Sequence, residues 1–89
     1  MTRAGAVTVR VVLSTGSSLE FTGGEKAFEI EASNVRGIIR AMDERFPGFG
    51  AYLEEETTVV IDGELRESAY YQPLRAGSEV FFLPKIEAG

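Results

Sequence analysis

Cysteine and histidine are both absent from this chain of 89 residues. Without cysteine the chain cannot build a disulfide scaffold, a zinc site of thiolates or a thiol nucleophile. Without histidine it has no Ser-His-Asp triad, no HExxH metal site and no imidazole to act as a general base near neutral pH. Any chemistry of this chain therefore depends on carboxylates, hydroxyls, amines, a cofactor or its own backbone.

Long apolar runs and an excess of positive charge are lacking as well. No apolar segment approaches the roughly 20 residues of a membrane-spanning helix, and the N-terminus has no signal-peptide pattern. Nine basic and 14 acidic residues give a net charge of −5, which disfavours nucleic acid and anionic membranes as partners. The length and the 44% hydrophobic content are typical of one small globular domain, which we expect to be cytoplasmic.

Two segments with alternating apolar residues predict the first strands. Residues 7–13 are rich in β-branched side chains, and residues 27–32 alternate between apolar side chains and glutamate. Between them we expect Ser14–Ser18 to break the first strand as a turn, with Leu19 and Phe21 covering one edge of the core. The two strands are therefore expected to pair antiparallel across a long hairpin connection.

The next segment has the spacing of an amphipathic helix. Either Ser33 or Asn34 can cap it, because a side-chain oxygen there accepts a hydrogen bond from the first turn. Five apolar residues then recur on one helical face. These are Val35, Ile38, Ile39, Met42 and Phe46. Pro47-Gly48 ends the helix, and the aromatic and leucine residues that follow predict a short helical turn packed on the core.

Residues 57–62 and 80–83 predict two further strands. The stretch 64–72 between them leaves a short edge strand open. Because residues 80–83 are apolar on both faces, they are typical of a central strand. These elements predict an α+β fold, a four- to five-stranded mixed sheet packed on one main helix. The economical arrangement is the β-grasp (ubiquitin-like) roll, in which the last strand lies parallel to the first, between it and the third.

Four short segments carry a resemblance to a known family. They are Leu19–Gly24, Val60–Gly63, Pro73–Val80, and Leu83-Pro84 followed by five residues that end in glycine. In this order and spacing they resemble the MoaD/ThiS family of sulfur carriers, which includes the small subunit of molybdopterin synthase. The resemblance covers nearly the whole chain. The family usually ends in Gly-Gly, whereas this chain ends in Ala88-Gly89.

The resemblance implies a β-grasp domain over residues 1–84 and a flexible tail over residues 85–89. It implies that an ATP-dependent, E1-like adenylyltransferase of the MoeB/ThiF type adenylates Gly89, which is then converted to a thiocarboxylate. The remaining tail residues would thread the active site of an acceptor enzyme, such as the molybdopterin synthase large subunit. These residues are Lys85, Ile86, Glu87 and Ala88. The carrier itself would bind no cofactor and would not be catalytic alone, since ATP is used by the activating partner.

The second face of the sheet suggests where partners dock. Phe81 and Leu83 are expected to point away from the helix, with Val12 and Val60 as neighbours. Edge loops could cover these side chains. Left exposed, they would form an apolar patch beside the root of the tail, and such patches in monomers usually mark partner sites.

Two alternatives to a sulfur carrier stay open. The same terminus could make the chain a ubiquitin-like protein modifier, or Ala88 could mark a non-catalytic β-grasp binding domain that has lost the tail chemistry. Within the carrier reading, molybdopterin biosynthesis is favoured, although thiamine, cysteine and tRNA thiolation pathways use the same fold and tail. Glu54-Glu55-Glu56 lacks the spacing of a calcium loop and predicts a solvated acidic loop, so no metal site is expected.

Overall fold

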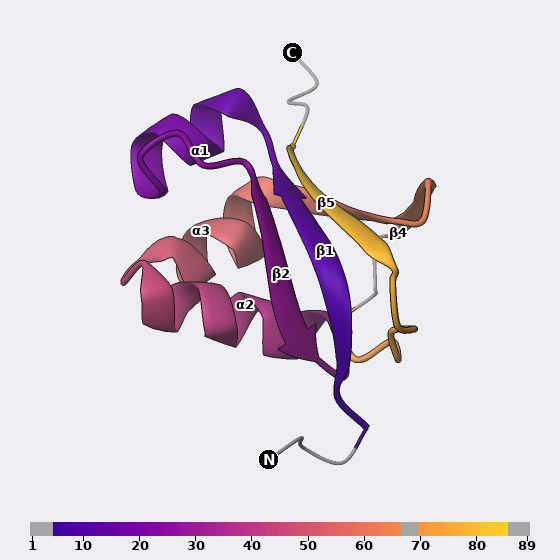
Figure 1. The fold of residues 1–89 in the computed structure, drawn as a ribbon. Coiled ribbons are helices and arrows are strands. Elements are labelled where there is room, and N and C mark those ends of the chain that lie inside the picture. Colours follow the sequence, from indigo (N-terminus) through magenta and orange to yellow (C-terminus); the bar gives the residue numbers. More distant parts are fainter. Residues whose placement is uncertain (1–4, 67–69, 86–89) are drawn as a thin grey trace.

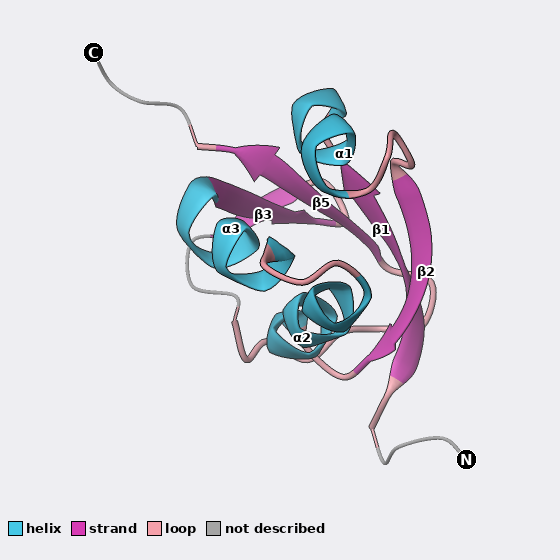
Figure 2. Cartoon of the chain, turned by 90° about the vertical axis from the view of Figure 1, so that its left-hand side faces the viewer, coloured by secondary structure: helices cyan, strands magenta, loops and turns pink. Residues whose placement is uncertain are grey.

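The computed structural model describes residues 5–66 and 70–85. Within these residues the elements are β1 (Val7–Leu13), α1 (Thr15–Phe21), β2 (Ala27–Ala32), α2 (Val35–Arg45), α3 (Phe49–Glu56), β3 (Thr57–Ile61), β4 (Glu64–Arg66) and β5 (Glu79–Pro84). The strands form one twisted sheet (Figure 1), and α2 and α3 lie on one side of it (Figure 2). This is the predicted α+β architecture.

The strand order of the sheet is β2-β1-β5-β3-β4. β1 and β5 run parallel, whereas the β1–β2, β3–β5 and β3–β4 pairs are antiparallel. The last strand thus lies between the first and the third, which confirms the predicted β-grasp roll. The ambiguous stretch after Asp62-Gly63 supplies a short edge strand, β4, paired with the end of β3.

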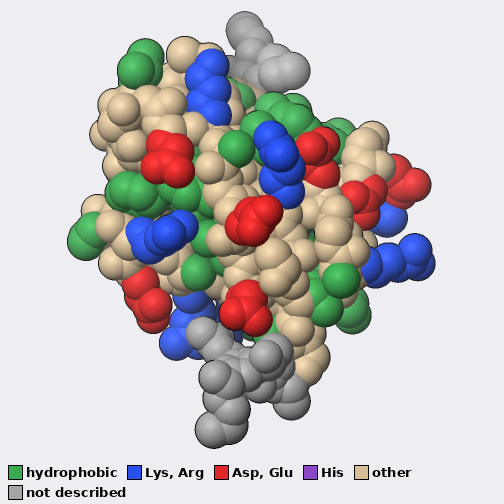
Figure 3. Space-filling view, viewed as in Figure 1, with side chains coloured by type: hydrophobic (Ala, Val, Ile, Leu, Met, Phe, Trp, Pro, Cys, Tyr) green, Lys and Arg blue, Asp and Glu red, His purple; other side chains and the backbone are tan. Residues whose placement is uncertain are grey.

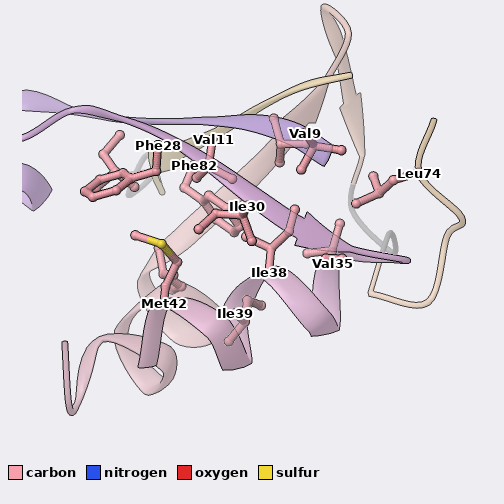
Figure 4. Close-up of a cluster of buried hydrophobic side chains, with 14 of the residues drawn as sticks. Val9, Val11, Phe28, Ile30, Val35, Ile38, Ile39, Met42, Leu74 and Phe82 are labelled. Atoms are coloured by element: carbon pink, nitrogen blue, oxygen red, sulfur yellow. The ribbon is translucent and has the colours of Figure 1, made fainter. Parts of the chain in front are cut away.

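The core forms where α2 packs on the sheet (Figure 4). Ile38 and Met42 of α2 are wholly buried, as are Val11, Val80 and Phe82 of the central strands. The cap of α2 is Asn34, whose side chain accepts a hydrogen bond from the amide of Gly37 at 3.0 Å. Burial of this helix face supplies most of its stability, since a helix of this length is marginal by itself.

The segment expected to be a turn, Ser14–Ser18, is instead the cap and first turn of α1. Ser14 occupies the N-cap and accepts a hydrogen bond from the amide of Ser17 at 3.2 Å. The Ser17 hydroxyl is buried and hydrogen-bonded to the hydroxyl of Tyr52 at 3.0 Å. The prediction was wrong because serine capping and a tertiary hydrogen bond outweigh the low helix propensity of this segment.

The same helix separates Leu19 from Phe21. In a strand these two side chains would share a face, but in a helix they point in very different directions. Phe21 packs inward and stacks on Phe49 with ring centroids 4.6 Å apart, as expected of an edge residue of the core. Leu19 is 69% exposed, so its predicted place over the core was wrong.

α3 is longer than the predicted short turn. Gly48 precedes it with a φ of 94°, a conformation that suits glycine. The Asp43 carboxylate ties α3 to α2, because its Oδ1 accepts hydrogen bonds from the amides of Gly48 and Gly50 at 3.1 and 2.9 Å. Glu54–Glu56 form the exposed end of this helix, and the prediction of a loop there was wrong.

Candidate functional site

Three of the predicted docking residues lie side by side on the sheet face away from α2. Val12 of β1 pairs with Phe81 of β5, and Phe81 also pairs with Val60 of β3. All three side chains are half-buried. Their neighbours in sequence on β5, Val80 and Phe82, point into the core. The structure therefore brings together, in one row across the sheet, residues that are far apart in the chain.

The row extends beyond the residues that sequence reasoning identified. Val12 also pairs with Ala27 of β2, and Val60 also pairs with Leu65 of β4, which is 63% exposed. We call the complete set the sheet-face row. It consists of Ala27, Val12, Phe81, Val60 and Leu65, one residue from each strand. An apolar strip of this kind, open to solvent at both ends, has the character of a protein-binding surface.

The Asp62-Gly63 pair is a signal in the sequence that could have identified Leu65. In the structure both residues have positive φ angles, of 49° and 84°, as in the tight turns that connect hairpin strands. A two-residue turn fixes the register of the strands that flank it. Ile61 must then face Glu64, and Val60 must face Leu65, as the structure shows.

Leu83 lies on the same side of β5 as Phe81, two residues closer to the C-terminus. It pairs with Thr58 of β3 and is 39% exposed. The sheet-face row and Leu83 thus lead along β5 towards the end of the strand. Partner docking through these residues stays a prediction, since the structure contains this chain alone.

A charged row borders the sheet-face row on the side where β5 begins. Arg10 of β1 lies opposite Glu29 of β2 and Glu79 of β5. Its Nε is 3.8 Å from the Glu79 carboxylate, and both side chains are at least half exposed to solvent. Such exposed pairs add little to stability. They give the surface beside the apolar strip alternating charges, which favour one orientation of a partner over others.

The tail leaves the domain at the other end of β5. The strand ends at Pro84, and the amide of Lys85 still donates a hydrogen bond to the carbonyl of Glu56 at 3.0 Å. The sheet therefore holds the backbone as far as Lys85. The predicted functional terminus Gly89 and the predicted threading residues Ile86, Glu87 and Ala88 lie outside the described residues. Four residues reach at most about 14 Å when fully extended.

A groove of about 970 Å³ adjoins this exit, with Leu53, Leu83 and Lys85 among the residues that line it. At its rim the Tyr70 hydroxyl donates a hydrogen bond to the Glu54 carboxylate at 2.7 Å. This hydrogen bond, together with desolvation and the negative charge of Glu54, raises the pKa of Tyr70 above its ordinary value. The phenol is therefore neutral at physiological pH and acts as a hydrogen-bond donor.

The described part of the chain contains no group of three or more acidic side chains placed to hold a metal ion. Within the same residues no helix is long and apolar enough to cross a membrane. The second hollow, of about 220 Å³ near Asp62, Arg66 and Arg75, has mixed charges that favour no one class of ligand.

Comparison of the structure with solved proteins gives consistent matches over the whole domain. The small chain of the Amycolatopsis orientalis BexX/CysO complex is 27% identical, with a TM-score of 0.76, and the match covers 91% of this chain and 99% of that one. The small archaeal modifier protein 1 of Methanosarcina acetivorans is 15% identical, with a TM-score of 0.74 and coverage of 94% and 98%.

A third match is the molybdopterin-converting factor complex of subunits 1 and 2 from Helicobacter pylori. Its matching chain is 20% identical, with a TM-score of 0.66, and the match covers 93% of this chain and 100% of that one. The chain has the β-grasp fold of the MoaD- and CysO-like sulfur carriers. The resemblance predicted from the sequence is thereby confirmed, with ubiquitin-like modifiers among the same neighbours.

No protein-family model and no curated protein matches the sequence. The relationship of this β-grasp chain to the carriers therefore rests on its fold. Two of the three structures described above are complexes with a second protein. The neighbours are small carrier proteins or subunits of larger assemblies.

Proposed function

We propose that the chain is a sulfur carrier that is adenylated and thiocarboxylated at Gly89 and then donates sulfur to a partner enzyme. The observation that carries this proposal is that β5 belongs both to the sheet-face row and to the root of the tail. This one central strand contributes Phe81 to the sheet-face row and then leads, through Leu83 and Lys85, directly into the tail. A partner that grips the sheet face is thus held at a fixed distance from the root of the tail.

The chemistry requires activation, because a carboxylate is a poor electrophile. An oxygen of the Gly89 carboxylate attacks the α-phosphorus of ATP, which forms an acyl-adenylate and releases pyrophosphate. Hydrosulfide then attacks the carbonyl carbon and AMP leaves, which gives the thiocarboxylate directly. Where the donor is a persulfide, the first product is an acyl disulfide, and attack of a second thiol of the donor on its S–S bond releases the thiocarboxylate and leaves a disulfide on the donor. A terminal glycine suits both steps, since it has no side chain to obstruct the approach of the nucleotide or the sulfur donor.

The proposed partners follow from these two stages. An E1-like adenylyltransferase of the MoeB/ThiF type would bind ATP and activate the tail in the cytoplasm. An acceptor such as the molybdopterin synthase large subunit would take the sulfur, and the carrier alone would bind no cofactor and catalyse nothing. Molybdopterin biosynthesis is supported by the structural match to subunit 1 of the molybdopterin-converting factor. The higher identity to the CysO chain supports a carrier for a different acceptor.

A second candidate function is protein modification through the same terminus. It is supported by the structural matches to small archaeal modifier proteins and to Urm1 of Trypanosoma brucei. The activation step is the same in both cases. The difference lies in the nucleophile that attacks the activated carbonyl, which is sulfur for a carrier and the amine of a lysine side chain for a modifier.

The proposal is tested by intact-mass measurement. The full chain is incubated with an activating enzyme from the same cell, ATP and a sulfur donor. Replacement of one oxygen by sulfur raises the mass by about 16 Da, whereas protein modification gives covalent products of much higher mass. Deletion of Gly89 should abolish the reaction. Ala88→Gly should react at least as fast as the natural chain. If the channel of the partner is tight around the methyl group of Ala88, the variant should react about five- to 150-fold faster.

The outcomes separate the candidates. A natural chain that stays unmodified while Ala88→Gly reacts would indicate a binding domain that has lost the tail chemistry. If neither chain reacts with any activating enzyme of that cell, the sulfur-carrier proposal is wrong. High-mass products on lysine-containing proteins, without the thiocarboxylate, would support the modifier.

A further inference from the structure

A second surface, away from the tail and sharing only Ala27 with the sheet-face row, lies along the outer edge of β2. β2 lies at one edge of the sheet and pairs on one side only, with β1. In Figure 2 it forms the right-hand margin of the molecule. All six of its residues pair with β1 without interruption, and the strand contains neither proline nor glycine. It therefore presents a long, regular edge, whereas the opposite edge strand β4 has only three residues.

The hydrogen-bond pattern shows which groups face outward. The amide of Leu13 donates to the carbonyl of Lys26 at 2.8 Å, and hydrogen-bonded pairs alternate along an antiparallel ladder. Phe28 and Ile30 therefore bond to β1, while the amides and carbonyls of the alternate residues point away from it. These alternate residues are Ala27, Glu29 and Glu31. Outside β1, no described residue forms a hydrogen bond with their backbone amides or carbonyls.

The side chains on this edge give it a definite charge. Glu29 and Glu31 are exposed on the sheet face away from α2, and neither forms an ion pair within the described part of the chain. In Figure 3 acidic side chains lie over the region that β1 and β2 occupy in Figure 1. The edge thus combines unpaired backbone groups with two carboxylates spaced two residues apart.

Charge decides what can pair with this edge. A second copy of β2 would place Glu29 and Glu31 opposite glutamates, and like charges in directly opposite positions are destabilising. Acidic side chains therefore protect the edge against self-association, as charges on edge strands commonly do. A strand with basic residues at every second position would instead place two of them beside Glu29 and Glu31, while its backbone completes the ladder.

We propose that the outer edge of β2 is a docking site for an extended segment of a partner protein that carries Lys or Arg at every second position. The residues between the basic ones would lie on the α2 side of the sheet, next to Phe28 and Ile30, where apolar side chains fit best. The site is separate from the tail, so it does not depend on the proposed sulfur chemistry. It would allow one partner to bind the edge while another engages the sheet-face row.

The test uses the full chain labelled with ¹⁵N and a capped peptide Lys-Val-Lys-Val-Lys. Binding should slow the hydrogen exchange of the amides of Ala27, Glu29 and Glu31 by about tenfold or more at saturation. The amides of Phe28 and Ile30, already bonded to β1, should change little. The control peptides are Glu-Val-Glu-Val-Glu and the rearranged Lys-Lys-Val-Val-Lys, and both should bind more weakly.

A matched pair of variants isolates the two carboxylates. The double substitution Glu29→Gln and Glu31→Gln should weaken binding of the lysine peptide by about two- to thirtyfold. The double substitution Glu44→Gln and Glu55→Gln removes the same net charge from exposed helical positions and should leave the affinity unchanged. Equal losses in both variants would show attraction to net charge alone and overturn the proposal.

Two other results would also overturn it. One is the absence of any change at peptide concentrations of about 1 mM. The other is protection or chemical-shift change centred on Val12, Phe81 and Val60, which would place the peptide on the sheet-face row. Both results would leave the sulfur-carrier proposal untouched, because that proposal is tested on Gly89.

Discussion

Phe81 and Phe82 are neighbours on the same strand and have the same side chain, but they lie in different surroundings. Phe82 points towards α2 and is wholly buried, whereas Phe81 points to the other face of the sheet and is only half-buried. The central strand β5 has the same apolar character on both faces. One face is covered by α2 and α3, and within the described residues no helix covers the other.

The comparison shows how one strand serves both stability and binding. On the covered face each apolar side chain contributes its full transfer free energy and fills space in a packed core. On the open face the side chains keep some contact with water, so folding does not gain their full transfer free energy. A partner that covers the sheet-face row would gain the remainder on binding.

The largest effect is expected from a charge on the covered face. Ile39 of α2 is 5% exposed, so Ile39→Asp places a carboxylate in the core with no partner. We expect a loss of about 3–5 kcal/mol, a large part of the total stability of a small domain. Urea denaturation measures it. Arg40→Asp puts the same side chain at an exposed neighbour and should cost less than about 1 kcal/mol.

The two phenylalanines test the comparison directly. Phe82→Ala should lower the free energy of unfolding by about 3–5 kcal/mol, because it leaves a cavity in the core. Phe81→Ala should cost about 1–2 kcal/mol, because the site is open to water and no closed cavity forms. Both values come from the same denaturation experiment. Equal losses would show that the second face is as tightly covered as the first.

Leu83 tests whether the open face binds partners. Because Leu83 is 39% exposed, Leu83→Glu should change the free energy of unfolding by less than about 1 kcal/mol. It should weaken binding to the activating or acceptor enzyme by about tenfold or more, as for a central interface residue. Calorimetric titration measures the affinity, with Ala51→Glu, at an exposed site of α3 on the covered side of the sheet, as the control. Unchanged affinity for Leu83→Glu would argue against docking there.

The smallest effect concerns the hydrogen bond at the rim of the groove. Glu54 raises the pKa of Tyr70 above its ordinary value of 10.0, so this hydrogen bond stabilises the fold below pH 10. That contribution is lost as the pH rises through the higher pKa of the folded state. Glu54→Gln should lower the pKa of Tyr70, measured from its ring resonances by NMR. Glu55→Gln should leave it unchanged, and an equal shift in both variants would contradict the assignment.

The sequence alone was sufficient for the elements that have a strong period. Alternation in residues 7–13 and 27–32, and the helical spacing from Val35 to Met42, reflect burial on one face, which a linear pattern records directly. The doubly apolar run at residues 80–83 was enough to place the last strand in the centre of the sheet. The resemblance to sulfur carriers then followed from short motifs in a fixed order.

Other features depended on contacts between distant residues. α1 forms because the Ser17 hydroxyl reaches Tyr52, and Phe21 stacks on Phe49; neither contact leaves a trace in the local pattern. Leu65 joined the sheet-face row only once the hairpin register was known. To identify the outward-facing groups of β2, it was likewise necessary to know which residue pairs of the ladder are hydrogen-bonded. Alternation in sequence does not show which backbone groups are paired.

By itself the sequence determined which kinds of chemistry this protein lacks the residues for, and which residues share a face of each strand. Composition and period are properties of the chain. Only the tertiary structure decided which apolar residues of different strands meet, and that the strand carrying Phe81 continues to Lys85 while still bonded to Glu56. The physical reason is that strand pairing joins residues through backbone hydrogen bonds, which every side chain permits almost equally. Register and neighbours are therefore set by turns and by packing across the whole domain.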